Sequence, residues 1–571
     1  MSDGFQATGS NAKALFTLKV HRGEGMALLA MNWKRGQPSD DFVGFAISYK
    51  EPAGDRFFPL TNRLSFPRPD GNIDLRQRPT TLAPIQKFRW VHFPRNAELD
   101  GDFLYRVTPV FMNERGELSY GDEQEVPIPL RRETYPGKLN VTFTRGFVSS
   151  QAFVDRFASK GPISTLLPDD AKQGLDFKPT HPETAVALDW MGFEARNAIL
   201  EVLQQAVDDP RAQVRVIAYD LNEPEIVDKL EALGKRLWVI VDDSDDHGKP
   251  DSAETAAAAR LGLTAAAVKR QHLGGLQHNK TIVVDGQTMQ TVVCGSTNFS
   301  WRGFFVQSNN ALVMHGAERV KVFRAAFDDY FASGDKPATF AKTKSAKLTP
   351  LRLRGIDAQV GFSPHGADTA LLKAVADDIS TKTTSSVLYS LAFLNQTRGP
   401  IRTAIKTVTD DPHIFVYGVS DTKVGGLDVQ KPDGNVAPVS FEALTKDVPP
   451  PFNAEPIGGK GIRMHHKFVV IDFDQPTARV WLGSYNFSGA ADTSNGENLL
   501  LVKDRRVAVA YAVEALRIFD HYHFRVAHEE AKAGRADALR LTPAPRTPAD
   551  KPWWDEYYTD SHKVRDREMF A

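Results

Sequence analysis

The sequence lacks several features that mark specialised classes of protein. Its 571 residues include one cysteine, Cys294, which excludes an intramolecular disulfide and favours a reducing compartment. The 70 basic and 71 acidic residues nearly cancel, so a global attraction to nucleic acid is absent, although a local basic groove stays open. No apolar run is long enough to cross a bilayer. These absences leave the class of ordinary globular proteins, and the length of the chain predicts two to four domains.

Targeting signals are also missing from the start of the chain. Met1-Ser2-Asp3-Gly4 has no basic segment followed by an apolar core, so we expect no secretory signal. The expected compartment is the cytoplasm, with export by a route that lacks a cleavable signal left open. Cys294 ends an apolar run before Gly295, which predicts a small buried thiol rather than a reactive one.

Residues 12–130 are predicted to form a β-sandwich. Apolar and polar residues alternate in four short runs, which turn-rich segments separate. The runs are Phe16-Leu18-Val20, Phe45-Ile47-Tyr49, Phe88-Trp90 and Tyr105-Val107-Pro109-Phe111. The stretch Tyr105-Arg106-Val107-Thr108-Pro109-Val110 resembles the penultimate strand of fibronectin type III modules, which implies a docking or spacing module that could bind another protein.

The pattern changes to alternating helices and strands at residue 139. The first copy has a helical stripe over 195–206, β runs at 214–219 and 237–241, and a closing helix over 320–331. The second has a stripe over 371–379, strands at 387–393 and 414–419, a helix between them, and a closing helix over 509–519. This order predicts a duplicated α/β fold, two pseudo-symmetric halves with mixed sheets flanked by helices, at 139–345 and 346–535.

Three segments fall outside the shared pattern. Residues 424–460 are rich in glycine and proline, and 242–275 form an insert rich in aspartate and alanine. We interpret both as long loops that act as lids or channel walls, with solvated surface excursions as the alternative. The tail, 536–571, carries Trp553-Trp554-Asp555-Glu556-Tyr557-Tyr558, and we expect these rings to fold back onto the body; a membrane-interface or partner contact is the alternative.

One motif occurs twice in the α/β region. His278-x-Lys280-x4-Asp285 is followed by Gly295-Ser296-x-Asn298, and His465-x-Lys467-x4-Asp472 by Gly483-Ser484-x-Asn486, 187 residues later. Residues two apart on a strand share a face, so each copy presents an imidazole, an ammonium, a hydroxyl and an amide together. The two aspartates have the opposite parity, which favours a role in holding the motif loop.

This residue set suits a phosphoryl centre and not a metal. Lysine, serine and asparagine donate hydrogen bonds to phosphate oxygens in the ground state and the transition state. One imidazole can attack phosphorus while the other, protonated, gives its proton to the leaving oxygen, and the environments of the two should split their pKa values. We therefore expect no cofactor and no metal.

At these residues the sequence resembles the phospholipase D superfamily over 139–535. The resemblance implies that His278 is the nucleophile and His465 the general acid, with Lys280, Lys467, Asn298 and Asn486 binding the phosphate. It implies that Glu497 orients a catalytic histidine, whereas Asn309 stands at the aligned position of the first copy. His466, between the motif residues, points the other way. The short Gly-Ser-x-Asn spacing is closer to bacterial branches of the superfamily.

The sequence leaves three functions to distinguish. A phospholipase D-type phosphodiesterase would hydrolyse or transfer a phospholipid head group at a membrane surface, in lipid metabolism, through a covalent phosphohistidine. A nuclease or DNA-processing phosphodiesterase is the alternative, which the near-zero net charge disfavours only weakly because local patches decide binding. A catalytically inactive binding protein is the third, and the intact motif residues in both copies argue against it.

Overall fold

The computed structural model describes residues 4–68, 76–130, 133–146, 150–368, 370–392, 394, 399–421, 426–431, 436–440, 464–532 and 539–571. The chain divides into two compact units. One comprises residues 1–132 together with 509–571, and the other comprises residues 133–508. The long helix α12 (Arg505–Lys532) begins in the second unit and continues into the first.

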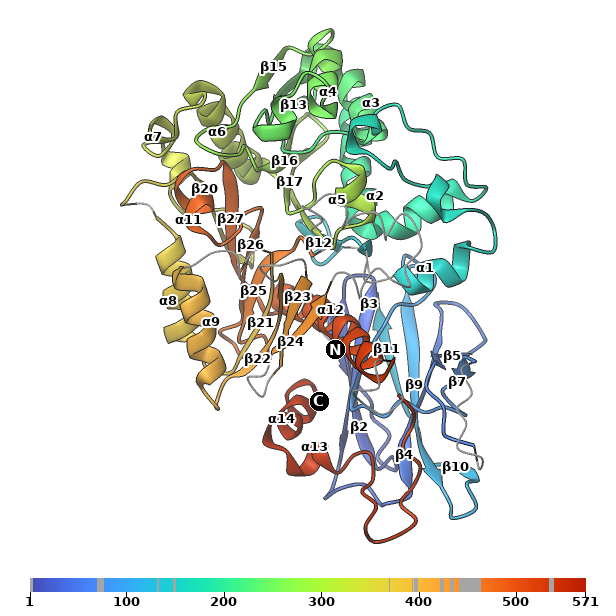
Figure 1. Cartoon of the computed structure of the whole chain (residues 1–571). Helices are drawn as coiled ribbons and strands as arrows, with labels where there is room; N and C mark the ends of the chain where they lie inside the picture. Colours follow the sequence, from blue (N-terminus) through green and yellow to red (C-terminus); the bar gives the residue numbers. More distant parts are fainter. Residues whose placement is uncertain are drawn as a thin grey trace. The chain divides into compact units, whose positions relative to one another are not determined.

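The first unit contains two main antiparallel sheets (Figure 1). One has the order β1 (Gln6–Thr8), β2 (Phe16–Gly23), β3 (Met26–Trp33), β8 (Arg89–His92). The other has the order β10 (Leu118–Tyr120), β9 (Asp102–Met112), β4 (Phe42–Lys50), β5 (Phe58–Pro59), with β11 (Gln124–Pro129) also on β9. A short pair, β6 (Thr61–Asn62) and β7 (Arg78–Pro79), completes the set. The predicted all-β N-terminal region is confirmed, and the fibronectin resemblance stays a prediction.

The aromatic tail packs into the core that these sheets share. Trp554 is buried in the same cluster as Phe16 and Phe45, and the ring of Trp553 stacks on that of Phe88 with centroids 5.3 Å apart. Two short helices, α13 (Glu556–Thr559) and α14 (Ser561–Phe570), follow these rings. The prediction that the tail folds back is confirmed.

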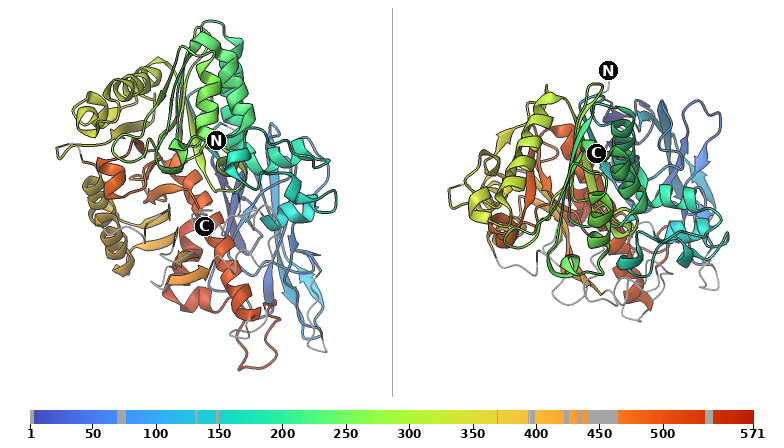
Figure 2. Two further views of the ribbon diagram at one scale, coloured as in Figure 1. Left: turned by 45° about the horizontal axis from the view of Figure 1, so that its top comes forward. Right: turned by 90° about the horizontal axis from the view of Figure 1, so that it is seen from above.

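The second unit contains two mixed sheets with helices beside them (Figure 1, Figure 2). The first has the order β12 (Leu139–Phe143), β18 (Asn310–His315), β17 (Gln290–Gly295), β16 (Lys280–Asp285), β13 (Gln213–Ala218), β14 (Leu237–Val241), β15 (Ala267–Arg270). Only the pairs β13–β14 and β14–β15 are parallel. Its helices are α1 (Ser150–Phe157), α2 (Thr184–Asp208), α3 (Pro224–Leu233), α4 (Ala253–Gly262), α5 (Trp301–Phe305), α6 (Ala317–Ser333) and α7 (Pro337–Phe340).

The second sheet has one parallel pair, β21–β22, among antiparallel neighbours. Its order is β19 (Thr349–Pro350), β20 (Asp357–Ser363), β27 (Glu497–Lys503), β26 (Arg479–Gly483), β25 (Lys467–Ile471), β21 (Ser386–Leu391), β22 (Phe415–Asp421), β23 (Gly426–Gln430), β24 (Val436–Ser440). The helices α8 (Leu372–Lys382) and α9 (Pro400–Asp410) run side by side, and their apolar stripes enter the same core as this sheet (Figure 1). A short helix, α11 (Gly489–Thr493), follows β26.

The insert at 242–275 is not the long loop that the sequence predicted. It forms a short 3-10 helix at Asp245–Gly248, then α4, then β15, which joins the sheet as a parallel edge strand. The helix is stable here because Ser252 caps it by accepting the N–H of Thr255, and the alanine-rich sequence has high helix propensity. The other predicted loop, 424–460, is corrected in part, because its described residues form the antiparallel strands β23 and β24, which extend the sheet beyond β22. The rest of this segment lies outside the described residues.

Two further predictions concern single residues and long helices. Cys294 on β17 is 1% exposed, and burial raises the pKa of its thiol, so it is the small buried residue that the sequence predicted. Among the described residues, no helix combines the length and apolarity that a membrane span requires.

Candidate active site

The two motif strands are the central strands of their sheets. β16 lies between β13 and β17, and β25 lies between β21 and β26. All five residues of β25 and nearly all of β16 are buried, as a sheet covered on both faces requires. Each motif strand pairs with its Gly-Ser-x-Asn strand, with Ile282 opposite Val293 and Phe468 opposite Leu482.

The glycine of each Gly-Ser-x-Asn segment allows a close approach of two strands. Gly295 has φ 134° and Gly483 has φ 144°, values that side chains rarely tolerate. A Cβ at Gly295 would lie 2.5 Å from the carbonyl oxygen of Asn310, and one at Gly483 would lie 2.2 Å from that of Asn498. The next residue then closes the contact, because Oγ of Ser296 and of Ser484 accepts the N–H of the same asparagines, each at 3.0 Å. The serines therefore position the strands.

His278 and His465 lie together where the two sheets meet. Their ring centroids are 6.1 Å apart in an edge-to-face arrangement, and both side chains are buried. The structure thus brings the histidines of the two motif copies together. Nδ1 of each histidine contacts a residue from the other motif copy.

Glu497, at the start of β27, supports His278. Nδ1–H of His278 donates to the Glu497 carboxylate, with distances of 2.8 Å to Oε2 and 3.0 Å to Oε1. The carboxylate is fully buried, so its charge acts on the imidazole with little screening. This contact fixes the tautomer in which Nε2 of His278 carries a lone pair.

Asn309, just before β18, supports His465 with a neutral amide. Nδ1–H of His465 donates to Oδ1 of Asn309 at 2.8 Å. The amide orientation is set because its Nδ2 donates to the carbonyl of Gly303 at 2.9 Å and its Oδ1 also accepts from Oγ of Ser296. The asymmetry between Glu497 and Asn309 noted in the sequence is therefore an asymmetry of charge beside the two imidazoles.

The two histidines differ in electrostatic environment. Burial lowers the pKa of His278, and the charge of Glu497 opposes this effect. Burial lowers the pKa of His465 well below its ordinary range, and the charges of Lys467 and Lys280 lower it further. His278 is therefore the more basic of the two imidazoles in the free protein.

The two motif lysines are buried beside their histidines. Nζ of Lys280 donates to the backbone carbonyl of His278, and Nζ of Lys467 donates to that of His465 at 2.7 Å. Burial lowers the pKa of Lys280 to about 7, although the carboxylates of Glu497 and Asp220 act in the opposite direction. Two lysines thus flank the histidine pair, and their protonated forms carry the positive charge that binds a phosphodiester.

Asn298 and Asn486 occupy equivalent places after the Gly-Ser segments. Within the described residues, the buried Oδ1 atom of each has no hydrogen-bond partner. Unsatisfied buried amide groups are costly, and they are retained mainly where a ligand or water completes them. The remaining predicted residue, His466, is fully buried; its Nδ1 lies 3.3 Å from Nδ2 of Asn310, and its ring meets Phe143.

The two motif aspartates differ in their contacts, and only Asp472 holds the backbone. Oδ1 of Asp472 accepts the N–H groups of Thr384 and Ser385 at 2.9 and 2.8 Å, which secures the turn that leads into β21. Asp285 is less buried and pairs with Arg324 of α6 at 2.7 Å. Neither carboxylate is placed to contact a substrate at the histidine pair.

Sequence reasoning missed a set of residues beside the pair. Tyr219 follows β13, and its ring centroid lies 4.7 Å from that of His278. Asp220 comes next, and Asp242 follows β14, so both lie at the carboxyl ends of parallel strands. Functional groups gather at such ends, and the predicted strands 214–219 and 237–241 could have directed attention there.

Two clusters among the described residues have the donor atoms of a metal site. In one, ligand atoms of Asp220, His247 and Glu254 lie within 4.8 Å of one another, and the other comprises Asp243, His272 and Asp335. In the first cluster both imidazole nitrogens of His247 already face carboxylates, Asp242 at 2.9 Å and Asp220 at 3.3 Å. That histidine is an ion-paired imidazolium and not a neutral ligand.

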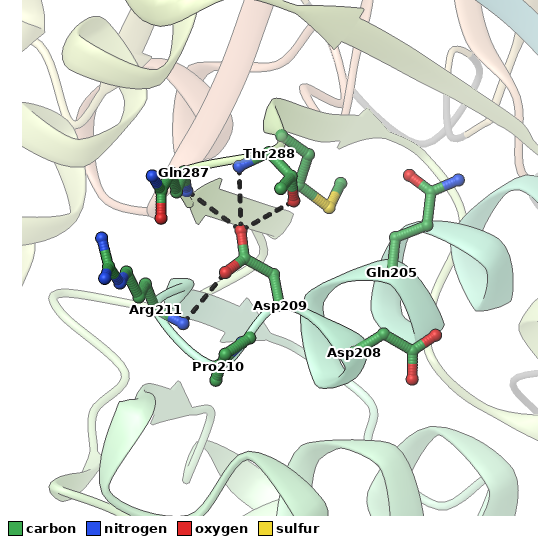
Figure 3. A pocket seen from close by; sticks show the side chains of 8 residues that line it. Gln205, Asp208, Asp209, Pro210, Arg211, Gln287 and Thr288 are labelled. Carbon is green, nitrogen blue, oxygen red and sulfur yellow. Dashed lines mark hydrogen bonds between the residues drawn. The ribbon is translucent and has the colours of Figure 1, made fainter.

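A surface hollow of about 430 Å³ lies away from the histidine pair, at the turn between β16 and β17 (Figure 3). It is lined by Gln205, Asp208, Asp209, Pro210, Arg211, Gln287, Thr288 and Met289. The Asp209 carboxylate in its centre accepts three backbone N–H groups and the hydroxyl of Thr288. These bonds lower the pKa of Asp209 to about 2, so its carboxylate is ionised and held by the backbone at neutral pH.

The chain matches the family profile described as "Cardiolipin synthase, PLD-like domain" over residues 199–331 and 450–519. These ranges contain both histidines and both of the strands that support them. These two segments of the chain are therefore similar to a phospholipase D-like domain. No curated protein sequence is significantly similar to it.

Several solved structures share low overall similarity with this chain. Phosphatidylserine synthase from Haemophilus influenzae is 15% identical over 58% of this chain and 85% of its own, with a TM-score of 0.42. Nuc from Salmonella typhimurium, a phospholipase D family member, is 25% identical over 24% of this chain and 87% of its own, with a TM-score of 0.21. Polyphosphate kinase from Porphyromonas gingivalis is 12% identical, with a TM-score of 0.36, and the match spans 55% of this chain and only 44% of the kinase.

Proposed function

We propose that the chain is a phosphodiesterase that cleaves a phospholipid head group, by hydrolysis or by transfer to an alcohol, through a phosphohistidine intermediate. One observation carries the proposal: two buried histidines from separate motif copies face each other, each with Nδ1 held by a residue of the opposite copy. Because Nδ1 of each ring is occupied, Nε2 is the ring atom left for a phosphoryl group.

We further propose that the two halves, 139–345 and 346–535, are duplicates related by an approximate two-fold axis. Contacts between them occur in reciprocal pairs, which is the mark of an isologous interface. Gln277 forms an isolated β-bridge with Gly496, and Met464 forms one with Ser308. Gln277 and Met464 directly precede the two histidines, and Gly496 and Ser308 directly precede the residues that support them. The hydrogen bonds from His278 to Glu497 and from His465 to Asn309 form a second reciprocal pair of contacts between the halves.

In the proposed first step, Nε2 of His278 attacks phosphorus. A P–N bond forms as the P–O bond to the leaving alcohol breaks, and Nε2–H of His465 gives its proton to the departing oxygen. The free His465 has a lowered pKa, so the negative charge of the bound phosphodiester must favour its protonated form. Glu497 stabilises the positive charge that develops on the His278 ring.

In the second step, water or an alcohol attacks the phosphohistidine. Neutral His465 now accepts the proton of the attacking oxygen, the new P–O bond forms and the P–N bond breaks, which restores both imidazoles. Lys280 and Lys467 balance the phosphate charge throughout, and the amides of Asn298 and Asn486 supply neutral hydrogen bonds. No cofactor is required by these steps.

Nucleic acid is the second candidate substrate. The same site chemistry would serve a nuclease. The near balance of charges in the sequence favours a phospholipid. Cytoplasmic location, bacterial origin and protein docking through the N-terminal region stay predictions from the sequence.

A side-by-side assay tests the proposal. The protein is incubated with phosphatidylcholine vesicles, phosphatidylglycerol vesicles or single-stranded DNA, in the presence of a chelator. We expect release of a head group, or its exchange for added ethanol, without a divalent ion. Cleavage of DNA alone would replace the phospholipid by the nuclease function, and an absolute need for a divalent ion would contradict the two-histidine mechanism.

A further inference from the structure

A third histidine lies close to the catalytic pair. Tyr219 presents one ring to three functional groups: its centroid lies 4.7 Å from the ring of His278, 4.5 Å from the ring of His247, and 4.6 Å from Nζ of Lys280. His247 is mostly buried and belongs to the insert that the sequence analysis described as a loop. The ring of Tyr219 therefore connects this insert to the proposed nucleophile and to its lysine.

His247 is held between two carboxylates. Its Nδ1 lies 2.9 Å from Oδ2 of Asp242, and its Nε2 lies 3.3 Å from Oδ1 of Asp220. Although burial disfavours its charge, hydrogen bonds to Asp220 and Asp242 raise the pKa of His247 to about 10. The imidazolium is thus present throughout the neutral pH range.

The same carboxylates reach both motif segments of the first half. Oδ1 of Asp242 accepts the N–H of Gln277 at 2.7 Å, and Gln277 directly precedes His278. Oδ2 of Asp220 accepts from Oγ of Ser300 at 3.2 Å, and Ser300 caps α5 two residues after Asn298. His247 therefore closes a bridge between the segment that carries the nucleophile and the segment that carries a phosphate-binding amide.

We propose that His247, clamped by Asp220 and Asp242, is a positioning residue that fixes Tyr219, His278 and Lys280 for phosphate binding and attack. The inference rests on the proposed function, because the bridge positions groups that bind and attack the phosphate in that reaction. The second half offers Ala392 at the place of Tyr219, where the chain leaves β21, so the bridge belongs to the half with the proposed nucleophile.

The charges around His247 predict the sign of each substitution. Asp220 and Asp242 face it from the ends of β13 and β14, Glu254 from α4, and Lys280 from β16 across the Tyr219 ring. Other charged groups nearby are Asp245 and Asp246 on the insert, Arg270, which donates to the carbonyl of His247, and Arg302, which acts on Asp220. Loss of the His247 charge should favour the protonated form of Lys280, and loss of the Asp220 charge should disfavour it.

Three variants, H247Q, D220N and H272Q, test the proposal through the pH dependence of kcat/KM. Lys280 must be protonated to bind phosphate, so activity should fall as pH rises through its pKa of about 7. We expect H247Q to move this alkaline limb to higher pH and D220N to move it to lower pH. Each shift should be roughly half a pH unit to one pH unit, because a single nearby charge changes a pKa by about that amount. H272Q is the control, since His272 is likewise bonded to an aspartate, Asp243, but in the other cluster.

A binding measurement keeps the test independent of turnover. Affinity for sulfate, whose charge is constant over this pH range, is measured by calorimetry in each variant. Shifts of the alkaline limb in opposite directions for H247Q and D220N, in activity and in sulfate affinity, support the bridge. Unchanged alkaline limbs, or shifts in the same direction, would overturn it. If one variant fails to fold, the sign of the other against wild type decides. If wild type cleaves no phosphodiester, the proposed function fails, and the sulfate titration still decides on the bridge.

Discussion

The variant H278A is expected to lower kcat for phosphodiester cleavage by roughly four to six orders of magnitude. His278 is the more basic imidazole, its tautomer is fixed by Glu497, and its Nε2 is the atom that must form the P–N bond. Without that atom, the lysines and amides can still bind phosphate but cannot form the intermediate. Initial rates on phosphatidylcholine or phosphatidylglycerol vesicles measure the loss.

The control for this variant is H413A, because His413 is an exposed histidine of the same unit, on the turn before β22. It should retain wild-type rates, and H278A should unfold at nearly the wild-type temperature and still bind sulfate. Activity of folded H278A within about tenfold of wild type would remove His278 from the role of nucleophile.

The variant E497Q is expected to reduce kcat by roughly two to four orders of magnitude, with a smaller change in KM. The glutamine amide has nearly the same shape, but it no longer stabilises the positive charge that His278 acquires when it carries the phosphoryl group. Burial would then lower the pKa of His278 further, so the acid limb of the pH profile should move to lower pH. Steady-state kinetics between about pH 4 and 8 measure both effects.

The matched variant for E497Q is N309D, which places a carboxylate beside His465. It should raise the pKa of His465, which must be protonated to act as the general acid, so the alkaline limb should move to higher pH, whereas E497Q moves the acid limb through His278. If E497Q retains full activity while N309D is inactive, the two histidines have the reverse roles, with His465 as the nucleophile.

Much of the architecture could be predicted from local sequence patterns. Period-two runs such as Phe45-Ile47-Tyr49 became strands, and the helical stripe through Val320 and Phe327 became α6. These elements were predictable because a buried face imposes its period on the sequence. The motif strands were the clearest case, since His278 and Lys280 precede an uninterrupted β-branched run.

The rest depended on contacts between segments distant in sequence. Nothing local to Asn309 shows that it supports His465, because the contact spans 156 residues. The insert was misread as a loop because its aspartates resemble a turn, whereas Ser252 caps a helix and β15 completes a sheet edge. Tyr219 and His247 were missed because each is an unremarkable residue until the fold brings it to the site.

The most direct test of the central claim is to trap the intermediate. A substrate labelled with ³²P in its phosphodiester is mixed with the protein, the reaction is stopped rapidly in alkali, which preserves phosphohistidine, and the labelled peptide is identified. The account predicts label on His278 in wild type, with increased occupancy in H465N, where breakdown is slowed. Label on His465, or turnover without any labelled histidine, would contradict it.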